Sequence, residues 1–319
     1  MNRDIVQFIY DLKLEQTNNS LSTRVKNRLI NMCFNKIKGS NPLIETYIGK
    51  YRLRLPFSHQ LPFIIKLFPN YSTNLARIAR KALEKYHDLK FIDIGANIGD
   101  TVALLRSEES FPILCIEGDD YFFSILEKNA SNFSDVYLAK CYVGESTERI
   151  NAVSVEIGGT ARLVQDSSKD NIILIKDILS IVEDYPLFKS SKIIKIDTDG
   201  FDNKIIRGSA DFIKLAKPII FFEYDPYFLS KQNDDSISIF SNLLDMGYKN
   251  VLIYENDGDY VLSAELTNKS LLEDITHFYS GRLSKKYCDI CAFHEEDNDL
   301  FLQIRSDEIN FFKKFRNYE

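Results

Sequence analysis

From residue 90 onward, short apolar runs alternate with segments of helical periodicity, and this alternation restricts the fold more than any other feature of the chain. The apolar runs predict strands at 91–94, 113–117, 136–141, 193–197, 219–223, 251–254 and 289–293. Segments between them predict helices at 100–106, 120–129, 203–215 and 235–246. Strands that alternate with helices in this way form parallel sheets covered on both faces. The sequence therefore predicts an α/β fold with a doubly wound, seven-stranded, mostly parallel sheet in a domain at 90–319.

The first 89 residues follow a different pattern. Helical periodicity covers 1–40 and 71–86, and the alternation at 46–55 predicts a short strand or hairpin. We expect a mainly helical N-terminal extension at 1–89 that acts as a lid, a docking element or a dimer contact.

Charge is divided unevenly between these two parts. Residues 1–90 hold 16 Lys and Arg against 6 Asp and Glu, a net +10, whereas residues 91–319 hold 24 against 40, a net −16. Such a division indicates packing between the two parts, a homodimer contact, an acidic partner or peripheral contact with a membrane. Because the basic residues are spread out, packing or dimer contact is the favoured interpretation. We expect no nucleic-acid partner, since no reader motif is present and the body is acidic.

The chain is expected to be cytoplasmic. No apolar run approaches the roughly 18 residues of a membrane span, and charges interrupt the N-terminal segment where a signal peptide would be apolar. Cys288 and Cys291 have a CxxC spacing, but on a strand they point to opposite faces, so we interpret them as core thiols.

The segment FIDIGANIGDT is a strand, a glycine turn and a helix start. Gly95 and Gly99 allow a tight turn close to a ligand, and Asn97 tolerates unusual backbone angles. Because the glycines are spaced G-x-x-x-G rather than G-x-G-x-x-G, the loop favours a nucleotide cofactor without a pyrophosphate. About 20 residues later, Glu117 ends the second strand, where a carboxylate would meet a ribose diol.

Further carboxylates follow the next two strands. Asp197 and Asp199 come after one strand and Glu223 ends the other, and these strand ends should meet beside the glycine turn. Crowded carboxylates bind a metal cation such as Mg²⁺, form an ion pair with a basic side chain such as that of Lys195, or retain a proton. We interpret the neighbouring Asp202 as a helix cap and Asp225 as the start of a turn.

At these motifs the chain resembles the FkbM-type methyltransferases, which use S-adenosyl-L-methionine. The resemblance spans about residues 56–299 and is carried by FIDIGANIGDT, IEGDDYFFSILEKN, KIIKIDTDGFDNKIIRGS, IIFFEYDP and YCDICAFH. The glycine loop of the family and its acidic strand end match at Asp93, Gly95, Ala96, Asn97, Gly99 and Glu117. The family's K-I-D-x-[ED]-G-x-[ED] motif matches at Lys195, Ile196, Asp197, Asp199, Gly200 and Asp202. One departure is Gly118, where the family usually has proline, which affects the local loop shape.

This resemblance implies a Rossmann-like class I methyltransferase that transfers a methyl group to a hydroxyl, typically on a sugar of a glycan or glycolipid. Asp197 or Asp199 would remove the hydroxyl proton, or would hold a metal together with Glu223. His59 and His294 are further candidates, His59 for substrate contact or a structural cap and His294 for reaching the acceptor.

A second hypothesis comes from Asp197-Thr198-Asp199, which is also a D-x-D motif of metal-dependent glycosyltransferases. It would leave the glycine loop and Glu117 without a role.

Overall fold

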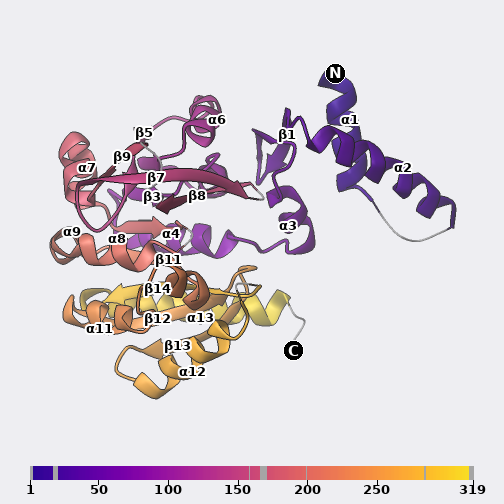
Figure 1. Cartoon of the computed structure of the whole chain (residues 1–319). Helices are drawn as coiled ribbons and strands as arrows, with labels where there is room; N and C mark the ends of the chain where they lie inside the picture. The colour runs from indigo at the N-terminus through magenta and orange to yellow at the C-terminus, as the bar shows by residue number, and fades with distance from the viewer. Residues whose placement is uncertain are drawn as a thin grey trace.

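The computed structural model describes residues 3–16, 21–157, 159–165, 171–198, 200–283 and 285–315 (Figure 1). Its central sheet has eight strands in the order β13-β12-β14-β11-β10-β3-β4-β5. Their bounds are β3 Phe91–Ile94, β4 Ile113–Glu117, β5 Val136–Lys140, β10 Ile193–Ile196, β11 Ile219–Tyr224, β12 Tyr248–Glu255, β13 Tyr260–Glu265 and β14 Cys288–His294.

The parallel strands of this sheet follow a doubly wound order. Counted from β3, they run 3-2-1-4-5-6 across the sheet, and β14 lies antiparallel between β11 and β12. The predicted α/β class and mostly parallel sheet are confirmed, and all seven predicted strands are present. The eighth strand, β13, pairs antiparallel with β12 at the sheet edge after a turn at Asp257-Gly258.

Helices cover both faces of the sheet. They are α4 Thr73–Lys85, α5 Asp100–Arg106, α6 Asp120–Ala130, α7 Ile178–Asp184, α8 Asp202–Gly208, α9 Ala210–Ala216, α10 Pro226–Lys231, α11 Ser238–Asp245, α12 Lys269–Ser280 and α13 Asn298–Phe315, with short 3₁₀ turns at Pro186–Ser190 and Glu295–Asp297. The helix predicted at 203–215 is divided into α8 and α9. The two helices are separated by Ser209. The preceding Gly208 lies against the backbone of Glu145, where a Cβ atom would come within 2.2 Å of the carbonyl oxygen.

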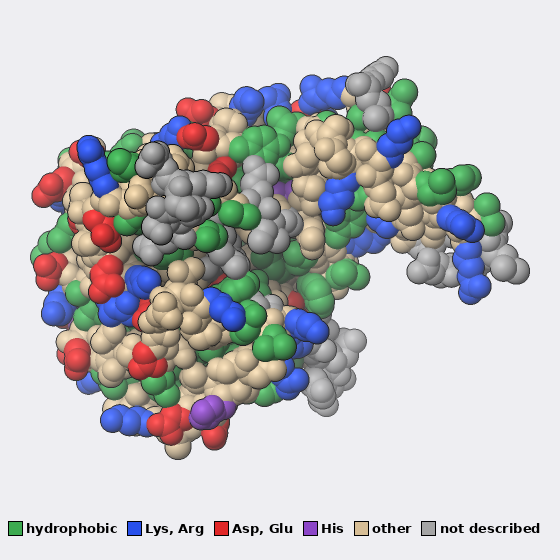
Figure 2. Space-filling model, in the orientation of Figure 1, with side chains coloured by type: hydrophobic (Ala, Val, Ile, Leu, Met, Phe, Trp, Pro, Cys, Tyr) green, Lys and Arg blue, Asp and Glu red, His purple; other side chains and the backbone are tan. Residues whose placement is uncertain are grey.

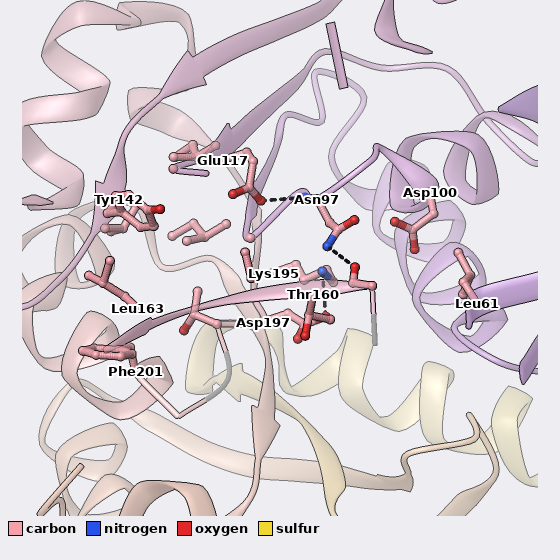
Figure 3. Close-up of a pocket in the computed structure, with 18 of the residues that line it drawn as sticks. Leu61, Asn97, Asp100, Glu117, Tyr142, Thr160, Leu163, Lys195, Asp197 and Phe201 are labelled. Atoms are coloured by element: carbon pink, nitrogen blue, oxygen red, sulfur yellow. Dashed lines mark hydrogen bonds and ion pairs between the residues drawn. The ribbon is translucent and has the colours of Figure 1, made fainter. Parts of the chain in front are cut away.

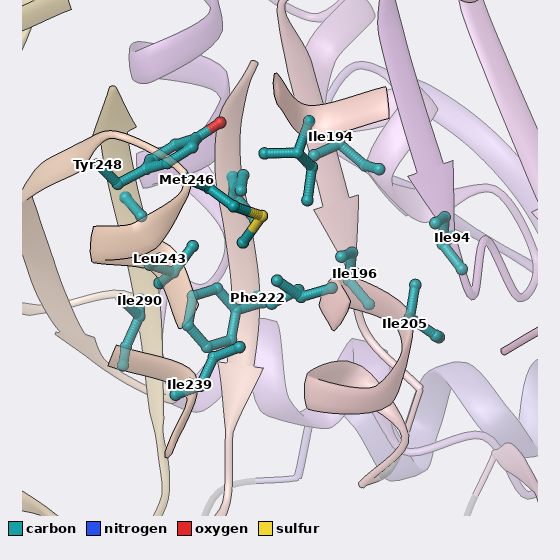
Figure 4. Close-up of a cluster of buried hydrophobic side chains, with 14 of the residues drawn as sticks. Ile94, Ile194, Ile196, Ile205, Phe222, Ile239, Leu243, Met246, Tyr248 and Ile290 are labelled. Carbon is teal, nitrogen blue, oxygen red and sulfur yellow. The ribbon is translucent and has the colours of Figure 1, made fainter. Parts of the chain in front are cut away.

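Alternate residues of each strand enter two separate cores. On one face, Ile194, Ile196 and Phe222 pack with Ile239 and Leu243 of α11 (Figure 4). On the other face, the strands pack against α4 and α13. The two cysteines of the CxxC pair are divided between these cores, which confirms that they point to opposite faces.

A second, four-stranded sheet is inserted between β5 and β10, in the order β6-β9-β7-β8. Its strands are β6 Tyr142–Val143, β7 Glu148–Ile157, β8 Thr160–Gln165 and β9 Ile172–Lys176. This sheet covers one side of the cavity described below.

The N-terminal part begins with two helices, a hairpin and a third helix: α1 Arg3–Leu14, α2 Leu21–Lys38, β1 Leu43–Ile48, β2 Tyr51–Pro56 and α3 Leu61–Leu67. The hairpin agrees with the prediction for 46–55. Its apolar core is shared with Ile98, Ala103, Phe122 and Ile125 of the following domain. The division at residue 89 stays a prediction. Helix α4 lies before residue 89 in the chain, yet it packs in the sheet core beside α13.

No helix within the described residues combines the length and the apolar character needed to cross a membrane.

Candidate active site

A cavity of about 240 Å³ opens at the carboxyl ends of β3, β4 and β10. This is the point at which the strand order reverses, and doubly wound sheets bind ligands there. The walls come from the glycine turn after β3, the second sheet and α3, so three separate parts of the chain build one site.

The glycine turn after β3 adopts backbone angles that favour glycine and asparagine. Gly95, Asn97 and Gly99 have φ of +81°, +48° and +84°. A Cβ atom at position 95 would also lie 2.0 Å from the carbonyl oxygen of Asp197, so any side chain there would push β3 and β10 apart. Gly95 and Asn97 line the cavity, whereas Asp93, Ala96 and Gly99 lie behind it as support for the turn.

Glu117 is buried at the end of β4 and lines the cavity. Its Oε2 atom accepts a hydrogen bond from the amide of Asn97 at 2.9 Å, and its Oε1 atom accepts one from the amide of Asp119 at 2.8 Å. Burial raises the pKa of Glu117 to about 7. Each carboxylate oxygen accepts two hydrogen bonds, so the fixed carboxylate retains acceptor capacity for a pair of hydroxyl groups.

The two ends of the cavity differ in their side chains. Figure 3 shows Tyr142, Leu163 and Phe201 on one side and Asp100 beside Leu61 on the other, with Glu117 between them. Burial raises the pKa of Asp100 to about 6. The cavity therefore suits a ligand with a flat apolar part, a hydroxylated middle and a polar or charged end.

The departure from the FkbM-type pattern at Gly118 has a local cause. A Cβ atom at this position would lie 2.4 Å from the ring of Tyr142, so the ring packs directly on the glycine backbone. A proline there would displace the aromatic wall of the cavity.

Asp197 lines the cavity and keeps 47% of its side chain exposed. The ammonium group of buried Lys195 lies 3.1 Å from Oδ2 of Asp197 and 3.2 Å from Oδ1 of Asp93. Burial alone would lower the pKa of Lys195, but the charges of Asp197, Asp93 and Asp100 outweigh it and raise this pKa well above its usual range. Lys195 is therefore a fixed cation between two carboxylates.

Glu223 lines a smaller cavity of about 20 Å³ that adjoins Lys195 and Asp197. In the sheet it lies opposite Asp289 of β14. Asp199, the third predicted catalytic or metal-binding residue, lies outside the described residues. Within the part of the chain that the structure describes, no three His, Cys, Asp or Glu side chains are placed to hold a metal ion. Lys195 is the cation that the structure places beside Asp197.

Two nearby aspartates have structural contacts. Asp225 caps α10 by accepting hydrogen bonds from the amides of Tyr227 and Phe228. Asp202 was predicted to cap the next helix, but it is the first residue of α8, and its Oδ2 atom instead accepts hydrogen bonds from the Thr198 hydroxyl and the Gly200 amide. It therefore fixes the turn that carries Asp197.

His59 connects three parts of the site. Its Nδ1 atom accepts a hydrogen bond from the amide of Leu61, and its Nε2 atom lies 3.4 Å from Oδ1 of Asn97. Asn97 in turn donates from Nδ2 to the carbonyl of Gly159, at the tip of the β7–β8 hairpin. Burial lowers the pKa of His59 to about 4. This neutral histidine connects the cavity walls, as a structural cap would. Because it also lines the cavity, its contact with a substrate stays a prediction.

The hypothesis that His294 reaches the acceptor is wrong. His294 ends β14, and because β14 is antiparallel, its last residue lies beside Tyr248 at the opposite edge of the sheet. The first residues of β14, including Asp289, lie at the edge that carries the site.

Several residues that line the two cavities carry no motif that predicts them from the sequence. They are Tyr71, Asp100, Tyr142, Tyr287 and Asp289. Asp289 lies at the start of the strand predicted at 289–293. Its place beside the site could not be predicted, because it depends on the antiparallel direction of that strand.

No model of a protein family matches the chain, and a search of curated proteins also found no match. Among solved structures, an O-methyltransferase from Bacillus cereus in complex with SAH is 11% identical, with a TM-score of 0.38 over 74% of this chain and 90% of that one. The methyltransferase FkbM from Methylobacillus flagellatus is 16% identical, with a TM-score of 0.36 over 78% of this chain and 55% of that one. A precorrin-6y C5,15-methyltransferase from Geobacter metallireducens is 14% identical, with a TM-score of 0.35 over 65% and 80%. Since these TM-scores are all below 0.5, the α/β assignment rests on the strand order of the sheet itself.

Proposed function

We propose that the protein is an S-adenosyl-L-methionine-dependent O-methyltransferase of the FkbM type that methylates a hydroxyl on a sugar of a glycan or glycolipid. The observation that carries this proposal is Glu117, a buried carboxylate fixed by two backbone amides in a cavity beside a glycine turn. The motifs shared with the FkbM-type family support the same cofactor.

The residues of the cavity fit this cofactor. Glu117 would accept the two ribose hydroxyls, and the wall of Tyr142 and Phe201 suits a purine ring. Asp100 would face the amino group at the other end. No phosphate-binding third glycine is needed, because this cofactor has no pyrophosphate.

When bound, the cofactor supplies an electrophilic methyl group on a sulfonium centre. Asp197 is the most exposed of the described carboxylates that line the cavity, so it would take the proton of the acceptor hydroxyl. Lys195 would hold this carboxylate in position through its ion pair. The acceptor would then approach from the exposed side of Asp197, and a carbohydrate is the partner that the family resemblance favours.

A thermal-shift comparison tests the proposed cofactor. We expect saturating S-adenosylhomocysteine to raise the melting temperature of the full chain, since a ligand present at about 100 times its Kd stabilises the fold by roughly 2.7 kcal/mol. UDP-sugars with Mn²⁺ are expected to leave it unchanged. The reverse pattern would exclude methyl transfer and favour a glycosyltransferase that uses Asp197-Thr198-Asp199.

Binding of S-adenosylhomocysteine should also depend on pH through Glu117. With a pKa of about 7, this carboxyl gains a proton as the pH falls and then loses acceptor capacity for the ribose hydroxyls. If only the ionised form binds, affinity rises roughly tenfold between about pH 6 and about pH 8. Titration calorimetry at several pH values measures this change. In Glu117→Gln the affinity should be weaker, and its change over this range should shrink to roughly twofold, the part that Asp100 contributes through its own pKa of about 6. An unchanged profile would contradict the assignment.

A further inference from the structure

Helix α2 exposes an apolar row on the side opposite its buried face. Its inner face packs into the N-terminal core through Phe34 and Ile37. On the outer face, Val25, Leu29 and Met32 are 66%, 60% and 63% exposed. Their spacing of four and three residues aligns them along one side of the helix. Among the residues that the structure describes, none covers these three side chains.

Basic side chains flank this row. Helix α2 carries five cations and no acidic residue: Arg24, Lys26, Arg28, Lys36 and Lys38. Over the described residues, none of these five makes an ion pair. Helix α4 differs, because Arg77, Lys81 and Lys85 pair with acidic residues of the C-terminal part. The positive charge of α4 is thus satisfied within the fold, whereas that of α2 is available to a partner.

The place of α2 in the molecule makes this surface accessible. Figure 1 shows α1 and α2 projecting away from the sheet, and Figure 2 shows hydrophobic and basic side chains together on this projecting end. Ile5 and Phe8 on α1 are also exposed. Exposed apolar side chains flanked by Lys and Arg are the pattern of helices that lie in the interface of an anionic membrane.

We propose that the outer face of α2, defined by Val25, Leu29 and Met32 with their flanking cations, docks the protein on an anionic phospholipid surface. The apolar row enters the region between headgroups and acyl chains, and the cations contact the phosphate and carboxylate groups. A second copy packed with its own α2 on this helix fits the face less well, because the two helices would bring five positive charges against five. This inference does not depend on the proposed methyl transfer.

A vesicle flotation experiment with the full chain tests the proposal. We expect binding to vesicles of phosphatidylcholine with phosphatidylserine, little binding to phosphatidylcholine alone, and a loss of binding as salt is raised. The double variant Leu29→Gln with Met32→Gln should reduce the partition coefficient roughly tenfold or more. A matched control changes two other exposed leucines, Leu215→Gln with Leu302→Gln, and should change it less than about twofold.

A second readout uses Cys33, the exposed cysteine of the five, as the attachment point for an environment-sensitive dye. Its emission should shift to the blue when the anionic vesicles are added and should not shift in the Leu29→Gln, Met32→Gln background. Equal binding to both kinds of vesicle, or equal binding of the two double variants, would overturn the proposal. So would a dimer in sedimentation experiments that the α2 variant abolishes, since this would assign the face to a second copy.

Discussion

Replacing Asp197 with asparagine is expected to reduce turnover by roughly 10²–10⁴-fold while affinity for S-adenosylhomocysteine changes by less than about threefold. Asparagine preserves the shape of the side chain but cannot take the proton of the acceptor hydroxyl. Because Asp197 lies on the solvent-accessible side of the cavity and Glu117 is the carboxylate proposed for the ribose, catalysis and cofactor binding should be separable. Transfer of a labelled methyl group to a glycan acceptor measures the first property, and calorimetry measures the second.

The control for this prediction is Asp120→Asn. Asp120 is an exposed carboxylate of α6 that pairs with Lys140 and lies outside the cavity, so its loss should leave turnover unchanged. If Asp197→Asn instead weakens the affinity for S-adenosylhomocysteine and leaves turnover unchanged, Asp197 belongs to the cofactor side of the cavity and not to the acceptor side. If EDTA abolishes the wild-type activity, a metal rather than a direct base assists the hydroxyl.

The second large effect is expected for Gly95→Ala. Alanine is strained at a φ of +81°, and its Cβ atom would lie 2.0 Å from the carbonyl oxygen of Asp197. Relief of this contact requires β3 and β10 to separate at the site, so we expect a loss of roughly 2–4 kcal/mol in unfolding free energy. We also expect S-adenosylhomocysteine to bind at least about 100-fold more weakly, which corresponds to roughly 2.7 kcal/mol.

Gly281→Ala is the matched control. Gly281 has a negative φ, and a Cβ atom there would meet its nearest neighbour at an ordinary 3.7 Å. Its substitution should alter the melting temperature and the affinity very little. Normal binding by Gly95→Ala would show that the turn does not form part of the cofactor site.

The parts of the fold that could be predicted from the sequence are those with strong local periodicity. The strands at 91–94 and 113–117 have the predicted bounds, because each is a short apolar run between clear turn signals. Gly95, Glu117 and Asp197 lie at the ends of β3, β4 and β10, and the sequence predicts them at one edge of the sheet because parallel strands share that edge.

The parts that could not be predicted depend on contacts between distant segments. The second sheet has polar and apolar residues mixed within β7 and β8, so its strands give a weak pattern. The pairing of Lys195 with both Asp93 and Asp197 depends on the neighbouring places of β3 and β10. Likewise, His59 reaches the site only because α3 folds over the glycine turn.

One of the missed features did have a local signal. The Asp257-Gly258 pair is typical of a hairpin turn, and Gly258 has a φ of +91° between β12 and β13. Recognition of that turn would have predicted the eighth strand.

The most direct test of the proposed cofactor site is a crystal structure of the protein grown with S-adenosylhomocysteine. We expect the ligand to occupy the cavity at the ends of β3 and β4, with both ribose hydroxyls donating to Glu117 and the purine against Tyr142. A ligand bound elsewhere, or a cavity that stays empty at saturating ligand concentration, would contradict this expectation.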